Sequence, residues 1–200
     1  MDRLGFRLQG TSWDGLFDRL RALGNCGAIL GPHGHGKTTF LDAFEAEFVA
    51  RGHRVQRFFL NDASPRLPDM LQFADDEVVI LDGAERLSWP LWRRFLWHAR
   101  HARGIVITVH AGRRLPVLFT CTTSLPLMDN LLRELWPEAP AHVRDDARDL
   151  FHRHDGNLRS VFRALYDCCG GMPRGWGQAP IMRGTTIFGD DPETFSQFKA

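Results

Sequence analysis

The stretch Gly31-Pro32-His33-Gly34-His35-Gly36-Lys37-Thr38 decides the fold. It fits the pattern G-x-x-x-x-G-K-[ST], and a match by chance in a chain of this length is on the order of 1 % from average residue usage. A turn rich in glycine lets successive backbone N–H groups point at a phosphate, and a following helix adds the partial positive charge of its N-terminus. We predict that this segment binds nucleotide phosphates. The phosphate loop, as we call it, comprises Gly31, Pro32, His33, Gly34, His35, Gly36, Lys37, Thr38 and Thr39.

Two side chains of the phosphate loop are expected to contact the ligand directly. Lys37 would reach the β- and γ-phosphates, and the Thr38 hydroxyl would ligate Mg²⁺, so the predicted cofactors are ATP and Mg²⁺. His33 and His35 occupy variable positions and are interpreted as spacers. The alternative, an ordinary Gly-rich turn, is disfavoured by the buried strand that precedes the loop and the helix that follows it.

Strands and helices alternate outward from the loop. Short apolar or alternating runs predict strands, and runs with apolar residues every three or four positions predict helices. This alternation predicts an α/β three-layer sandwich whose central, mainly parallel sheet has five strands, with ligands bound beyond the carboxyl ends of the strands. The expected strands are 26–30, 54–60, 78–81, 105–110 and 117–122; the expected helices are 14–23, 38–50, 88–103, 127–135, 141–153 and 157–168.

The chain is expected to divide into three parts. Residues 1–136 would form the nucleotide-binding core, and residues 137–169 a small helical lid. Residues 170–200 are rich in glycine and proline, show no clear period, and are interpreted as a tail.

Two acidic residues are candidates for the chemistry. Asp82 ends the apolar run 78–81, and a carboxylate in that position can hold Mg²⁺ through water. Glu85 follows three residues later and is a candidate general base for water, with an ordinary surface carboxylate as the alternative. Asp82 and Thr38 are thus the predicted metal-binding residues.

Three further residues are candidate sensors of the nucleotide. Thr108 or His110, at the end of the strand 105–110, would lie near the γ-phosphate; the alternative is a loop without nucleotide contact. Arg159 lies one turn into the last helix and is expected to point back at the nucleotide, with an exposed arginine as the alternative.

In order and type, these segments resemble those of AAA+-like P-loop ATPases over roughly residues 10 to 168. The resemblance rests on the phosphate loop, the acidic strand 78–85, the polar strand end 108–110 and the segment Gly156-Asn-Leu-Arg159. It implies that the phosphate loop is the Walker A motif and that Asp82 ends the Walker B motif. It also implies a strand-end sensor at Thr108 or His110, a helical lid, and a lid arginine at Arg159.

Two departures from that family bear on turnover. Gly83, and not glutamate, follows Asp82, which is more similar to the NACHT branch of the STAND signalling ATPases. The run from 110 to 116 is too short for the helix that usually presents an arginine finger, so Arg113 or Arg114 would have to substitute. We expect slow hydrolysis, with Glu85, Asp82 and Arg159 as the catalytic candidates.

Composition narrows the partners and the compartment. The formal net charge is +1 and 24 % of residues are charged, which argues against a protein basic over its whole surface. The segment from Arg86 to Arg114 nevertheless holds seven arginines and no acid, so nucleic acid is a possible partner there, with a solvated helix face as the alternative. No apolar run reaches membrane-spanning length, and the cysteines lack zinc-type spacing, so a cytoplasmic protein without membrane contact is expected.

Three functions remain open. The first is an AAA+-like ATPase that moves its lid and remodels a protein partner or its own oligomer. The second is a nucleotide-gated switch with negligible turnover, and the third is a P-loop kinase of a small molecule. GTP is disfavoured because no Asn-Lys-x-Asp element is present; Phe6, Leu8 and Trp13 are candidates for an adenine pocket.

Overall fold

The computed structural model describes residues 6–8, 10–60, 67, 72–112 and 114–168. Within these residues the chain forms two compact units. The sheet unit comprises residues 6–33 and 40–122, and the helical unit comprises residues 34–39 and 123–168. The predicted tail at 170–200 lies outside the described residues, as does Arg113.

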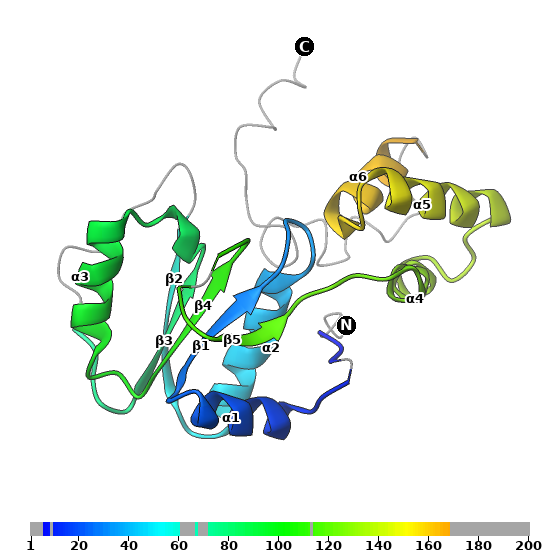
Figure 1. The fold of residues 1–200 in the computed structure, drawn as a ribbon. Coiled ribbons are helices and arrows are strands. Elements are labelled where there is room, and N and C mark those ends of the chain that lie inside the picture. The colour runs from blue at the N-terminus through cyan, green and yellow to red at the C-terminus, as the bar shows by residue number, and fades with distance from the viewer. Residues whose placement is uncertain (1–5, 9, 61–66, 68–71, 113, 169–200) are drawn as a thin grey trace, which may run out of the picture. The chain divides into compact units, whose positions relative to one another are not determined.

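A five-stranded parallel sheet forms the centre of the sheet unit (Figure 1). The strand order is β2-β3-β4-β1-β5, so β4 lies between β1 and β3. All neighbouring strands are parallel, which confirms the predicted fold class. The strands are β1 (Cys26–Leu30), β2 (Arg54–Phe59), β3 (Glu77–Asp82), β4 (Gly104–Val109) and β5 (Val117–Thr120).

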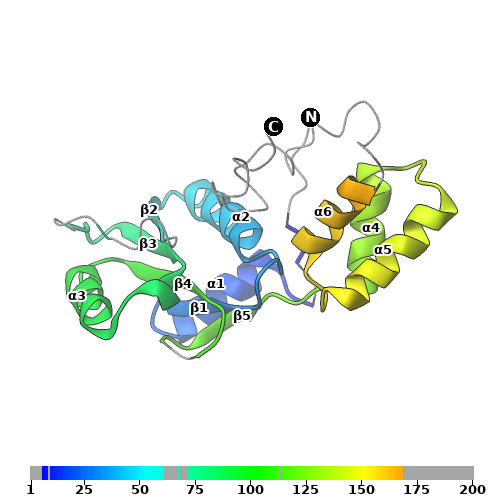
Figure 2. The same ribbon diagram turned by 90° about the horizontal axis from the view of Figure 1, so that it is seen from above.

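Helices cover both faces of this sheet (Figures 1 and 2). One face carries α1 (Trp13–Ala22) and the part of α2 (Lys37–Ala50) that follows Thr39, and an aromatic stripe from α2 is buried there. The other face carries the short 3-10 turn η1 (Ala84–Arg86) and α3 (Trp89–Ala99). The three-layer sandwich predicted from the alternating sequence is therefore present.

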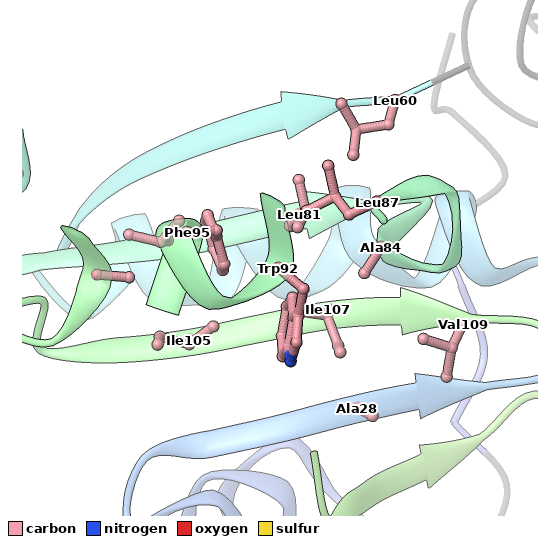
Figure 3. Packing of buried hydrophobic residues seen from close by; sticks show 12 residues of the cluster. Ala28, Leu60, Leu81, Ala84, Leu87, Trp92, Phe95, Ile105, Ile107 and Val109 are labelled. Atoms are coloured by element: carbon pink, nitrogen blue, oxygen red, sulfur yellow. The ribbon is translucent and has the colours of Figure 1, made fainter. Parts of the chain in front are cut away.

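The inner side of α3 explains why this helix stays on the sheet. Trp92, Phe95 and Ala99 recur at helical spacing and are at most 2 % exposed. Figure 3 shows Trp92 and Phe95 facing the side chains of β3 and β4. Burying a large apolar side chain stabilises a fold by about 1.5–3 kcal/mol, so this cluster fixes the turn that leads from β3 into α3.

The helical unit has its own core. It contains α4 (Leu125–Leu135), α5 (Ala141–Arg153) and α6 (Leu158–Cys168), which Figure 2 shows side by side. Their apolar sides pack together around Val143, Val161 and Phe162. The sequence places a boundary after residue 136, whereas this unit already begins at Thr123. The physical reason is that Met128 and Leu132 of α4 are buried with α5 and α6. No helix in the described part of the chain is long and apolar enough to span a bilayer.

Candidate nucleotide-binding site

The phosphate loop follows β1 directly, as the sequence predicts. Gly31 donates its backbone N–H to the carbonyl oxygen of Val109 on β4 at 3.3 Å, so the start of the loop is anchored to the sheet. Gly34 and Gly36 have φ of 73° and 81°, a left-handed conformation that residues with a side chain rarely adopt. Helix α2 begins at Lys37, inside the phosphate loop, and the Lys37 side chain is buried. A helix N-terminus thus follows the glycines, the arrangement that favours an anion.

Residues 34–39 of the loop belong to the helical unit, and the tip of the loop contacts the segment before α6. A Cβ atom on Gly34 would overlap the Asn157 side chain unless that side chain moved, and the φ of 73° also favours glycine there. The Asn157 Oδ1 atom also accepts a hydrogen bond from the Ser160 N–H at 3.1 Å, which caps α6. One asparagine therefore both starts the last helix and touches the loop.

His35 extends this contact. Its Nδ1 atom lies 3.4 Å from the Thr123 hydroxyl, which donates a hydrogen bond to the Gly156 carbonyl oxygen at 2.7 Å. Burial lowers the pKa of His35; the hydrogen bond to the Asp155 backbone opposes this shift, and the Lys37 charge reinforces it. His35 is therefore neutral near pH 7, and it is a contact residue of the helical unit, whereas the sequence treats it as a spacer.

In the sheet unit, Asp82 at the end of β3 is held by Thr108 of β4. The Thr108 hydroxyl donates to Asp82 Oδ1 at 2.6 Å and accepts from the Gly83 N–H at 2.8 Å. Both side chains are buried, at 4 % and 1 % exposed. Thr108 therefore orients the carboxylate, whereas the sequence offers Thr108 as a sensor.

Arg57 on β2 gives Asp82 a second neighbour, which the sequence analysis does not single out. Its guanidinium lies 3.5 Å from Asp82 Oδ2 and pairs with Asp42 and Glu45 on α2. Each of these carboxylates is half-buried or buried. The only sequence signal was a cation within an alternating strand, and that does not say which carboxylates it would face.

Glu85, the candidate general base, and His110, a candidate sensor, are in contact. Glu85 Oε1 lies 2.8 Å from His110 Nε2, and each side chain is 25 % exposed. The ring of His33 stacks on that of His110 with 3.5 Å between centroids. A carboxylate, an imidazole and a second imidazole thus form one polar cluster beyond the carboxyl ends of β3 and β4.

Gly83 explains why the usual glutamate is displaced. Its φ is 85°, and a Cβ atom there would lie 2.5 Å from the Leu60 carbonyl oxygen. Any side chain at this position would meet backbone that cannot move aside cheaply. The first acid after Asp82 in this turn is Glu85, on η1.

Arg114 and Arg159, the arginines proposed as a finger and as a lid residue, have different surroundings. Arg114 donates to the Leu87 carbonyl oxygen at 2.5 Å and lies over the Trp92 ring, so it ties the loop after β4 to the turn before α3. The Arg114 guanidinium is thus engaged within the chain, and its part as an arginine finger stays a prediction. Arg159 is half-buried in the first turn of α6, two residues after Asn157 and in the same unit as Lys37.

The candidate adenine-pocket residues pack into the core. The Phe6 ring lies edge-on to Phe40 at 5.1 Å, and the Trp13 ring stacks on Phe44 at 5.8 Å. Phe6, Leu8 and Trp13 are partly buried against the α1–α2 face of the sheet. Their contacts are those of packing residues, and their part in binding a base stays a prediction.

Comparisons with known proteins give a likeness of fold. No protein-family model matches the sequence, and no curated protein matches it. A solved DNA replication initiation factor is 17 % identical with a TM-score of 0.48, and 76 % of this chain spans 62 % of that one. Two variants of Thermotoga maritima RuvB are 12 % and 11 % identical to this chain, with TM-scores of 0.47 and 0.45. The matched regions cover 78 % and 85 % of this chain and 69 % and 74 % of the RuvB chains. All three TM-scores are below 0.5 and all three identities are below 25 %, so these likenesses assign neither a family nor a role to this chain.

Proposed function

We propose that this chain is an ATP-binding switch of the AAA+-like type, which binds ATP–Mg²⁺ at the phosphate loop and hydrolyses it slowly. The observation that carries the proposal is the contact, inside the helical unit, between the tip of the phosphate loop and the segment before α6. Gly34 touches Asn157, and His35 reaches Gly156 through Thr123. A phosphate held by the backbone N–H groups of the loop would lie beside this contact, so the contact could transmit nucleotide binding to α6.

The donors present suit the predicted ligands. Backbone N–H groups, the N-terminus of α2 and the Lys37 ammonium provide positive charge for phosphates. The Thr38 hydroxyl and the Asp82 carboxylate are hard oxygen donors of the kind that Mg²⁺ prefers, and they would hold it. Bound there, Mg²⁺ would neutralise phosphate charge, while Thr108 keeps the Asp82 carboxylate oriented.

Slow turnover follows from the neighbours of Asp82. Water attacks a γ-phosphate efficiently when a positioned residue orients it. Gly83 leaves no room for a side chain, and the Glu85 carboxylate already interacts with His110 at 2.8 Å. We therefore assign Glu85 and His110 as the pair on which residual hydrolysis depends.

Hydrogen exchange tests the switch. We expect the amides of residues 155–160 to change their protection when ATP–Mg²⁺ binds to the full chain, and Lys37→Ala to abolish the change. Asn157→Ala should still bind ATP, as calorimetry would report, but its residues 155–160 should respond less. Asn130→Ala removes an exposed asparagine of α4 and serves as the matched control. Nucleotide binding with unchanged exchange in the helical unit would overturn the coupling.

The affinities of an Arg159 variant for ATP and ADP test the same proposal. If Arg159 senses the third phosphate, Arg159→Ala should weaken the binding of ATP more than that of ADP. The difference should be about 5- to 150-fold for a typical coupling. Equal weakening of both nucleotides would leave a general electrostatic role, and no weakening would remove Arg159 from the site.

A small-molecule kinase is the weaker candidate. Such an enzyme needs a mobile basic lid, and Arg114, in the loop after β4, is engaged with Leu87 and Trp92. ATP consumption that rises strongly with an added acceptor would favour the kinase. If the chain is a switch, the partner that responds to the helical unit would be another protein or a second copy of this chain.

A further inference from the structure

The outer side of α3 carries two tryptophans in solvent. Trp89 and Trp97 are 67 % and 61 % exposed, while Trp92 on the inner side is 2 % exposed. Exposed tryptophans are unusual because an indole ring gains much from burial. The inner side already provides the apolar contacts that hold α3 on the sheet (Figure 3). Among the described residues the Trp97 ring contacts only its neighbours His98 and Arg100, and neither outer ring belongs to the core cluster under α3.

Arginines lie between and beside these rings. Trp89, Arg93 and Trp97 follow each other at four-residue spacing and so lie along one side of the helix. Arg100 continues the row, with its guanidinium 4.2 Å from the centroid of the Trp97 ring. The two tryptophans are eight residues apart, which corresponds to about 12 Å along the helix axis. We call these four residues the α3 outer face.

The charge of the α3 outer face is not balanced by acids nearby in the sequence. No aspartate or glutamate occurs between Arg86 and Met128. Arg93 and Arg100 are both exposed, and the exposed Arg94 adds a third cation to the same helix. The face therefore suits a polyanion that also offers flat, apolar surfaces.

We propose that the α3 outer face binds single-stranded nucleic acid, a function separate from the nucleotide switch. Unpaired bases stack on aromatic rings in a way that tolerates any sequence, and arginines meet the phosphates. A duplex hides the faces of its bases, so the two rings would gain nothing from it. A helix that lies on a membrane needs a continuous apolar face with cations at its margins. Here Arg93 lies between the rings, and the apolar side of α3 is used by the sheet.

Fluorescence anisotropy with a labelled oligo-dT of fifteen nucleotides tests the proposal on the full chain. The double variant Trp89→Ala/Trp97→Ala should weaken binding by at least about 5-fold for each ring that stacks on a base. The double variant Arg93→Ala/Arg100→Ala should lower the slope of log K against log salt by about 1.4, at roughly 0.7 per lost phosphate contact. Tyr166→Ala and Arg21→Ala, exposed residues of α6 and α1, are the matched controls and should leave both quantities unchanged.

Three outcomes would overturn the proposal. The first is no binding of oligo-dT, and the second is binding that the tryptophan double variant leaves intact. The third is capture of the chain by phosphatidylserine vesicles without oligo-dT binding, which would make α3 an interfacial helix. Thermal unfolding of each variant checks the fold, and we expect little change because the altered side chains project into solvent.

Discussion

Replacing Thr108 by valine should destabilise the sheet unit strongly, although the two side chains have nearly the same shape. The hydroxyl is 1 % exposed, donates to Asp82 and accepts from the Gly83 N–H. A hydrogen bond to a charged group contributes about 1.5–3 kcal/mol, and a buried N–H left without an acceptor costs about 1–3 kcal/mol. We therefore expect Thr108→Val to lower the free energy of unfolding by about 3–5 kcal/mol.

Urea denaturation followed by circular dichroism measures this loss. Thr120→Val, at the exposed end of β5, is the matched control and should change the free energy of unfolding by less than about 0.5 kcal/mol. A loss below about 1 kcal/mol for Thr108→Val would refute the reasoning, because the hydroxyl would then not hold the Asp82 carboxylate and the Gly83 N–H.

Other predictions concern the turn after β3 and the loop tip. Gly83→Ala should cost clearly more stability than Gly52→Ala, because both glycines have positive φ but only Gly83 would place a Cβ against the Leu60 carbonyl; equal losses in thermal unfolding would remove the steric argument. The chain should hydrolyse ATP below about 0.1 s⁻¹, well under the common median of roughly 10 s⁻¹, and Glu85→Gln should lower the rate without loss of binding; a phosphate-release assay that gives several turnovers per second contradicts this. Burial lowers the pKa of His35, so as the pH falls the unfolded chain binds a proton at His35 before the folded chain does. The free energy of unfolding should therefore fall as the pH drops through about 6.5 toward the lowered pKa. If His35→Gln shows the same pH profile of stability as the unmodified chain, this contribution is excluded.

The sequence predicts the sheet and the loop well because their signals are local. A continuous apolar run such as that before Asp82 is typical of a strand buried on both faces, and β3 is buried along its whole length. The G-x-x-x-x-G-K-[ST] pattern likewise predicts a strand, a turn and a helix, and β1 and α2 flank the loop. The five-stranded parallel sheet is confirmed on this basis.

The contacts around the candidate site could not be predicted in the same way, because they join residues far apart in the chain. Thr108 and Asp82 meet only because β3 and β4 are neighbours in the sheet. The contact of Asn157 with Gly34 depends on how α6 packs in the helical unit. Gly83 could be recognised in the sequence as a departure, but its cause, the nearby Leu60 carbonyl, needs three-dimensional structure.

Calorimetric titration of the full chain with ATP–Mg²⁺, compared with Lys37→Ala, tests the central claim most directly. We expect the unmodified chain to bind one nucleotide and the variant to bind it at least about 10-fold more weakly, because the lost charge-assisted hydrogen bonds contribute about 1.5–3 kcal/mol each. Arg21→Ala, which removes an exposed cation on α1, should bind like the unmodified chain. Equal affinity in the unmodified chain and Lys37→Ala, or no binding by the unmodified chain, would contradict the account.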